Sequence, residues 1–331
     1  MIHDGGSAGS AHLLVAPDSF KGTFGAPEVS AAVARGVRRA GLEAEELPIA
    51  DGGEGTLEAL VAALDGELHT TTVADPFGRP VEGRFALLPD GRGLVEMAEA
   101  SGLARLTEGE RDAWRASTRG TGELIVAAVR AGARSVILGV GGSATTDGGA
   151  GCLEALDQAG VDPAIEVVCD VNTPWEDAAR VFGPQKGADP STVKRLEERL
   201  EKLAEQAPRD PRGVPMTGCA GGLSGALFTH RGASLEPGAA YLLDALGFDE
   251  RAAAARLVIT GEGRLDAQTL SGKAVGEVTA RAQRLGTPCH ATVGEDALGG
   301  PEARRLGLAG VHVASTMAEL EDVGRRIAEG L

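Results

Sequence analysis

The sequence predicts an α/β protein whose main parallel sheet is built from both ends of the chain. Short apolar runs alternate with helical patterns at the start of the chain and again at its end, while the middle follows a different pattern. The length of 331 residues favours two domains over one. Hydrophobic residues make up 43% and aromatic residues only 3%, so the cores must consist of Ala, Val, Leu and Ile.

The N-terminal part reads as strand, helix, strand and helix. Residues 12–20, "HLLVAPDSF", form a buried strand that enters a loop, and residues 30–41 have helical periodicity with a glycine stop. Residues 43–56 give a second strand and a Gly-rich turn, followed by the helix "TLEALVAAL". This order predicts a parallel sheet. Residues 1–12 are rich in Gly and Ser, lack an apolar signal core, and are expected to form a flexible tail.

The middle of the chain begins with an antiparallel pattern. Residues 69–102 alternate in polarity and contain turn signals at Asp75-Pro76 and at Pro89-Asp90-Gly91. Helices are then expected at 121–133, 148–160, 191–206 and 221–228, with strands at 135–140 and 166–171. The mixture indicates a second α/β domain.

The C-terminal part returns to alternating strands and helices. Three short apolar strands are expected at 256–263, 288–295 and 310–315. Together with the first two strands they complete a five-stranded parallel domain from residues 13–72 and 254–331. Residues 73–253 then form an insertion of about 180 residues, which is long enough for a domain of its own.

Charge and cysteine content exclude several classes of protein. The formal charge of −16 gives no basis for a nucleic-acid or membrane surface. No apolar run is long enough to span a membrane. The four cysteines are far apart and have no zinc-binding spacing, which favours free buried thiols in a reducing compartment. We therefore expect a cytoplasmic location.

Five Gly-rich loops share one design, with small residues and one or two charges next to a strand or helix. They span 16–22, 50–56, 141–149, 219–226 and 260–273. Loops at the carboxyl ends of parallel strands bind ligands in open α/β sheets, and glycine lets backbone N–H groups approach an anion. Such glycines can also serve only as turn formers. No Walker A, GxSxG or HExxH motif is present, and "GVGGSA" lacks the acidic residue that a dinucleotide fingerprint requires.

The charged residues in and near these loops suit phosphoryl transfer, although solvated loop charges are the alternative. Carboxylates can hold Mg²⁺ or accept a proton, and cations can bind phosphate or carboxylate. Asp147 is also a residue type that suits a helix N-cap. The carboxylates are Asp51, Glu54, Asp147, Asp170, Glu262 and Asp266, and the cations are Lys21, Lys186, Arg264 and Lys273.

Six motifs together resemble the type I glycerate kinase family, in the same order and from about residue 13 onward. They are "APDSFKG", "DGGEGT", "STRGTGELI", "GGSATTDGGAG", "CDV" with "FGPQKGA", and "LVITGEGRLDAQTLSGK". The chain departs from the family between Gly151 and Cys169, where it lacks a segment that the family usually carries. Trp175 also stands where the family prefers a small aliphatic residue.

The resemblance implies a flavodoxin-like domain from both chain ends, an inserted α/β domain and a cleft between them. It also implies phosphorylation of D-glycerate by ATP with Mg²⁺, most often at the 2-hydroxyl. The alternative product is 3-phosphoglycerate. One possible assembly is a homodimer. A kinase for another small hydroxy acid and a non-catalytic binding protein are the rivals.

We assign roles to the loop residues within this interpretation. Asp51 or Asp147 is the candidate base, and Lys21 and Lys273 are the phosphate clamps. Asp170 and Asp266 are the expected metal ligands. The residues expected to bind ATP or the glycerate carboxylate are Gly141, Gly142, Ser143, Thr145, Lys186, Gly221, Gly222, Glu262 and Arg264.

Overall fold

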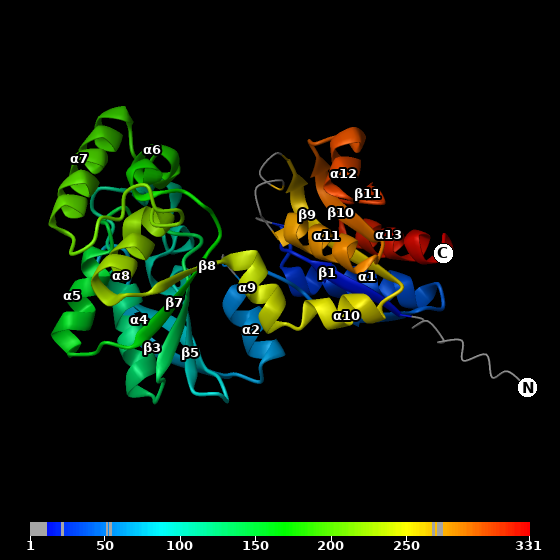
Figure 1. Ribbon diagram of the computed structural model, residues 1–331, viewed down its shortest axis with the longest axis horizontal. Helices are drawn as coiled ribbons and strands as arrows, with labels where there is room; N and C mark the ends of the chain where they lie inside the picture. The colour runs from blue at the N-terminus through cyan, green and yellow to red at the C-terminus, as the bar shows by residue number, and fades with distance from the viewer. Residues whose placement is uncertain (1–11, 21–22, 51, 53–54, 267–268, 270–273) are drawn as a thin grey trace, which may run out of the picture. The chain divides into compact units, whose positions relative to one another are not determined.

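The chain forms two compact units, each with its own sheet. The computed structural model describes residues 12–20, 23–50, 52, 55–266, 269 and 274–331. Contacts group Met1–Ala50 with Leu242–Leu331, which we call the terminal unit, and group Asp51–Tyr241 as the inserted unit. Figure 1 shows helices and strands in both units, and each sheet contains parallel strand pairs, so the predicted α/β class is confirmed.

The terminal unit contains a five-stranded parallel sheet of order β11-β10-β9-β1-β2. Within this unit the order is 2-1-3-4-5, the flavodoxin-like order, as predicted. The strands are β1 (His12–Pro17), β2 (Glu43–Glu46), β9 (Leu257–Leu265), β10 (Cys289–Asp296) and β11 (Gly310–Val313). The helices are α1 (Ala26–Arg39), α10 (Phe248–Ala254), α11 (Ala274–Leu285), α12 (Gly300–Leu306) and α13 (Met317–Glu329), while α9 (Gly238–Ala245) spans the boundary between the units.

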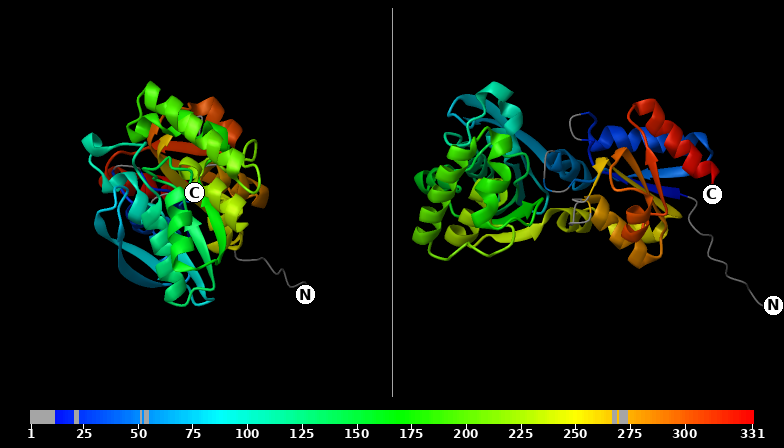
Figure 2. Two further views of the ribbon diagram at one scale, coloured as in Figure 1. Left: turned by 90° about the vertical axis from the view of Figure 1, so that its left-hand side faces the viewer. Right: turned by 90° about the horizontal axis from the view of Figure 1, so that it is seen from above.

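The core of the terminal unit depends on a close contact between α1 and α13, which lie side by side in Figures 1 and 2. Alternate residues of β1, Leu13 and Val15, pack with both helices, and the run from Leu13 to Ala16 is fully buried, as in a strand covered on both faces. A glycine makes the helix contact possible. A Cβ at Gly324 of α13 would lie 2.1 Å from the carbonyl oxygen of Val33 in α1.

The inserted unit contains a six-stranded sheet of order β3-β4-β5-β6-β7-β8. Its first three strands are antiparallel and the remaining pairs are parallel, in agreement with the predicted antiparallel start. The strands are β3 (Glu67–Ala74), β4 (Pro80–Leu87), β5 (Arg92–Glu96), β6 (Ser135–Gly139), β7 (Ala164–Cys169) and β8 (Ser234–Pro237). The α-helices are α2 (Thr56–Ala63), α3 (Ala98–Ser101), α4 (Arg119–Arg130), α5 (Ala150–Ala159), α6 (Ala178–Phe182), α7 (Pro190–Gln206) and α8 (Leu223–Arg231).

The boundaries between the units differ from the predicted 72/73 and 253/254. Strand β3 pairs with β4 from Glu67 to Ala74, and this pairing brings the preceding helix α2 into the inserted unit. At the other boundary, α10 packs on α11 and so belongs to the terminal unit. The polarity change at residue 69 marks the start of the antiparallel pattern, but the helix before it already packs on the inserted sheet.

The α1–α13 contact predicts that Gly324→Ala lowers the stability of the protein. Alanine gains about 1 kcal/mol over glycine in helix propensity, but its methyl group would push against a backbone oxygen, and such overpacking costs roughly 1–3 kcal/mol. Denaturant unfolding should therefore show a net loss. Gly109→Ala is the control, because no atom lies within 4 Å of its added Cβ. A Gly324→Ala variant as stable as wild type would mean that α1 and α13 can move apart without a loss of stability.

Candidate functional site

Three of the five predicted Gly-rich loops meet in the inserted unit at the carboxyl ends of β5, β6 and β7. The backbone N–H of Gly141 donates to the carbonyl of Gly52 at 3.1 Å, which joins the loop after β6 to the stretch 50–56. The N–H of Gly148 donates to the carbonyl of Gly221 at 3.0 Å, which joins the same loop to 219–226. This edge of a parallel sheet is where ligands bind in α/β folds. Asp51, which the sequence proposes as a base, lies outside the described residues.

Glycine is required where these loops contact one another. Gly221 has a φ of +64°, and a Cβ there would lie 2.2 Å from the carbonyl oxygen of Thr145. A Cβ at Gly222, with a φ of +96°, would lie 2.9 Å from the ring of Trp175. Trp175 is buried and donates its ring N–H to the carbonyl of Leu200 at 2.9 Å. The two glycines therefore serve backbone packing, and Trp175 fills the space beneath them.

The carboxylate of Asp147 is buried and accepts four hydrogen bonds from the chain. One oxygen accepts from the backbone N–H and the hydroxyl of Thr118, both at 2.9 Å, and from the N–H of Gly151 at 3.2 Å. The other oxygen accepts from the N–H of Gly149 at 3.1 Å. Asp147 thus joins the loop to the beginnings of α4 and α5, a larger role than that of a helix cap alone.

The side chain of Lys186 is 1% exposed and holds the same loop from another side. Its Nζ donates to the carbonyl of Thr145 at 2.6 Å. Burial lowers the pKa of the ammonium to about 8, and the charges of Asp147 and Asp170 partly oppose this shift. Because Lys186 is enclosed by the chain, the geometry favours a tether for the loop over direct contact with a ligand.

The small hydroxyl residues of the loop are also buried. The hydroxyl of Thr145 lies 3.4 Å from the carbonyl of Ala220, and Ser143 forms a short antiparallel bridge with Gly102. The carbonyl of Gly142 accepts from Leu103 at 2.8 Å. The loop is therefore fixed by the chain along most of its length, which gives a preorganised backbone at the sheet edge.

The other two Gly-rich loops lie in the terminal unit, at the switch point between β1 and β9 where the strand order reverses. The N–H of Asp18 donates to the carbonyl of Gly261 at 2.8 Å, which joins the loop after β1 to the middle of β9. In flavodoxin-like sheets this switch point is where ligands bind. Lys21 and Lys273, the proposed phosphate clamps, belong to these loops but lie outside the described residues.

The described charges of these loops differ in exposure. Glu262 is buried and accepts from the hydroxyl of Thr269 at 2.6 Å. Thr269 in turn accepts from the N–H of Asp266 at 3.2 Å, so the three residues form one network. The exposed guanidinium of Arg264 lies 3.8 Å from Asp266 and 3.4 Å from Glu295. Arg264 is therefore accessible to an anionic ligand.

The expected metal ligands fit only a simple type of magnesium site. Within the described part of the chain, no three His, Cys, Asp or Glu side chains gather as a metal cluster. Asp170 follows β7 in the inserted unit, and Asp266 follows β9 in the terminal unit. Mg²⁺ commonly binds one or two carboxylates together with substrate phosphates and water. Either residue could supply such a carboxylate.

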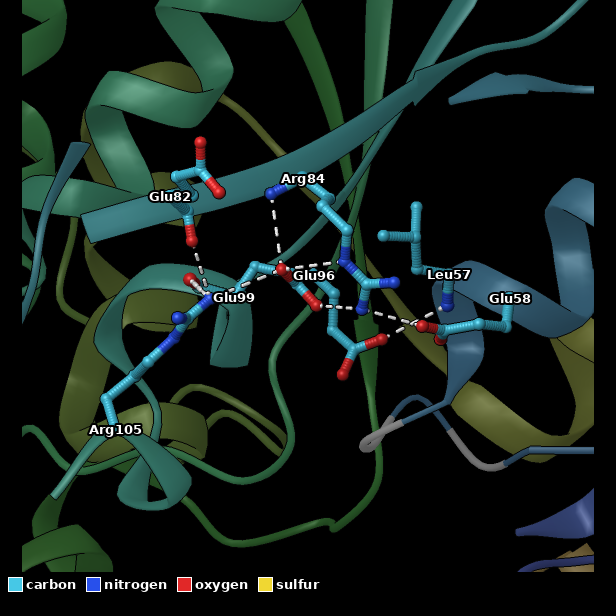
Figure 3. Close-up of polar contacts among 7 residues, drawn as sticks. All are labelled: Leu57, Glu58, Glu82, Arg84, Glu96, Glu99 and Arg105. Atoms are coloured by element: carbon cyan, nitrogen blue, oxygen red, sulfur yellow. Dashed lines mark hydrogen bonds and ion pairs between the residues drawn. The ribbon is translucent and has the colours of Figure 1, made fainter. Parts of the chain in front are cut away.

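One buried carboxyl group near the loops was not predicted from the sequence. Glu96, at the end of β5, is 4% exposed and accepts a hydrogen bond from the backbone of Leu57 at 3.1 Å (Figure 3). Burial raises its pKa to about 8. The only sequence signal was an acidic residue at the end of an apolar run, next to "MAEASG".

Comparisons with known proteins agree with this architecture. A sequence model described as the glycerate kinase family matches residues 13–164 and 157–331. The chain belongs to the glycerate kinase family. The two matched segments overlap at residues 157–164, within the stretch from Gly151 to Cys169, and α5 there connects to β7 through only 160–163.

Individual relatives support the same membership, and the protein is a kinase of this family. It is 38% identical over 301 residues to the glycerate 2-kinase of Escherichia coli K12, and 40% identical over 304 residues to the glycerate kinase of Bacillus subtilis 168, covering 79% of each chain in both cases. A crystal structure assigned as a glycerate kinase 2 from Salmonella typhimurium LT2 superposes with a TM-score of 0.80 at 34% identity, covering 96% of this chain and 97% of that one. In the described residues, no helix combines the length and apolar character needed to cross a membrane.

The contacts of Asp147 predict that Asp147→Asn destabilises the protein. Asparagine has one acceptor oxygen, so its NH₂ group would face at least one N–H donor, and a buried unsatisfied group costs roughly 1–3 kcal/mol. Denaturant unfolding should show this loss. Asp162→Asn, at an exposed position, is the control and should leave stability unchanged. Full stability in Asp147→Asn would mean that the loop adjusts to the amide.

The lowered pKa of Lys186 predicts a pH dependence of stability. Between pH 8 and 10.5 the unfolded chain keeps the proton on this lysine and the folded chain does not, so the free energy of unfolding rises with pH in that window. Through this group the free energy of unfolding is about 3 kcal/mol lower below pH 8 than above pH 10.5. Lys186→Met lacks the titrating group, so the stability of wild type relative to this variant should rise from pH 8 to 10.5. A constant difference would show that the pKa of Lys186 is not lowered.

Proposed function

We propose that this protein phosphorylates D-glycerate with ATP and Mg²⁺, and that the product is 2-phosphoglycerate. Family membership supports the reaction, and the 38% identity to a protein named glycerate 2-kinase supports the position of the new phosphate ester. The convergence of Gly-rich loops at the carboxyl edge of each sheet supports a small, anionic substrate. A cytoplasmic location is part of the proposal, and the four free, buried cysteines are consistent with a reducing compartment.

In this reaction the substrate hydroxyl oxygen forms a bond to the γ-phosphorus of ATP, and the bond from that phosphorus to the bridging oxygen of ADP breaks. The hydroxyl proton passes to a carboxylate or to water. We assign the base to Asp51, because both oxygens of Asp147 already accept hydrogen bonds from the loop. When bound, Mg²⁺ offsets negative charge on the phosphates.

The remaining residues bind and orient the reactants. Lys21, Lys273 and the exposed Arg264 are proposed to bind phosphate groups. The backbone at Gly141, Gly142 and Ser143 is proposed to hold the glycerate carboxylate or a phosphate at the edge of the inserted sheet. Lys186, Gly221 and Gly222 act through the loop, because their contacts are with the chain itself.

The reaction can be tested with the purified chain and two coupled assays. ADP release, followed with pyruvate kinase and lactate dehydrogenase, should require both D-glycerate and ATP. Enolase alone should convert the product to phosphoenolpyruvate if it is 2-phosphoglycerate, whereas 3-phosphoglycerate would require added phosphoglycerate mutase. Glycolate, L-glycerate and D-lactate test the rival kinase. Binding of D-glycerate in a calorimeter without ADP release would contradict the proposal and favour the binding protein.

A further inference from the structure

Glu96 occupies a position between the sheet and two of the Gly-rich loops. It is the last residue of β5 and pairs in register with Gly139, the last residue of β6. The loop 141–149 begins two residues after that neighbour. Glu96 therefore lies at the carboxyl edge of the inserted sheet, and its side chain is almost fully buried there.

The carboxyl group of Glu96 holds the start of α2. It accepts the backbone N–H of Leu57 at 3.1 Å (Figure 3). It also accepts a backbone hydrogen bond from Gly55. The first N–H groups of a helix have no partner within the helix, and the N-cap here is Gly55, which has no side chain to supply one. Glu96 supplies the missing acceptor from another strand.

The surroundings of Glu96 favour its neutral form. The nearby Arg84 pairs instead with Glu99 and with Glu58, the latter at 2.7 Å, and Arg105 also pairs with Glu99 (Figure 3). Within the described chain, no lysine or arginine forms an ion pair with Glu96. Burial without a neighbouring cation disfavours the charged form of a carboxyl group. Its pKa is raised to about 8, first by burial and then by the charges of Glu58 and Glu99, with the two backbone hydrogen bonds opposing the shift.

A second contact holds the same stretch from the opposite side. The carbonyl of Gly52 accepts the N–H of Gly141, and a Cβ at Gly52 would lie 3.0 Å from the carbonyl of Val168 in β7. The chain is therefore held at Gly52 by Gly141 and at Gly55 and Leu57 by Glu96, and the proposed base, Asp51, directly precedes Gly52 in the sequence. We propose that Glu96 is a positioning residue for the phosphoryl transfer, one that fixes the backbone at Gly55 and Leu57.

This inference rests on the proposed function, so the first measurement does not depend on activity. Hydrogen–deuterium exchange should be faster in Glu96→Ala than in wild type in peptides covering residues 55–60, because the acceptor is lost. Glu96→Gln keeps an acceptor oxygen and should exchange at nearly the wild-type rate. Glu123→Ala is the matched control in the same unit, since Glu123 accepts the N–H of Ala74 at 2.8 Å, away from this stretch. It should leave exchange at 55–60 unchanged.

The second measurement is kinetic. Glu96→Ala should lower kcat roughly ten- to a hundredfold with little change in the KM for D-glycerate, because misplacement of a reacting group acts mainly on the transition state. Glu96→Gln should restore most of the turnover.

The outcomes separate the two proposals. Wild-type exchange and turnover in Glu96→Ala would overturn the positioning role, and so would a Glu96→Gln variant as impaired as Glu96→Ala. If Glu96→Ala does not fold, Glu96→Met takes its place, because methionine keeps a similar volume but has no acceptor oxygen; wild-type exchange at residues 55–60 and wild-type turnover in that variant overturn the role. If wild type does not act on D-glycerate but the exchange contrast holds, the proposed function fails while Glu96 keeps its role as the anchor of α2.

Discussion

The four hydrogen bonds accepted by Asp147 are the interaction on which the inserted unit's loops depend. A carboxylate is costly to bury, and it is stable here because donors from Thr118, Gly149 and Gly151 surround it. These donors come from the beginnings of two helices, whose unpaired N–H groups favour an anion. On the other side, Lys186 holds the carbonyl of Thr145. Two opposite buried charges therefore fix one short loop, and the strand edge beneath it determines where the loop can lie.

The five loops divide between the two sheets according to the topology of each. Parallel strands bring all their carboxyl ends to one edge, so loops far apart in sequence become neighbours within a unit. The inserted unit gathers three loops whose described charges are buried and committed to the chain. The terminal unit gathers two at its switch point, where Arg264 is exposed and Glu262 is held by Thr269. The described part of the inserted unit thus offers a rigid backbone cradle, and that of the terminal unit offers an accessible charge, two features that phosphoryl transfer uses.

Sequence patterns predicted the strands well because a continuous apolar run such as Leu13–Ala16 has few alternatives to a buried strand. They placed the unit boundary too late because the membership of α2 depends on contacts with β4 and β5, and no local pattern encodes such contacts. Among the site residues, a pattern identifies Lys186 as a cation in a loop but cannot show that its side chain is enclosed. Glu96 was not identified from the sequence, because an acidic residue at the end of a strand is usually exposed and here it is buried.

The many glycines in the loop after β6 are a further case in which the sequence pattern does not show what a residue contacts. Glycine allows a backbone to approach a ligand, and it equally allows a backbone to approach another part of its own chain. The sequence favours the first use, because hydroxyls and a carboxylate lie among the glycines. The structure shows the second use where the loop 219–226 meets this loop, because a Cβ at Gly221 would collide with Thr145 and a Cβ at Gly222 with Trp175. The Asp147 end of the loop is likewise committed to the chain. The beginning of the loop, at Gly142 and Ser143, is the part nearest the strand edge where α/β sheets bind anions, and this is why we propose it as the place where a ligand binds.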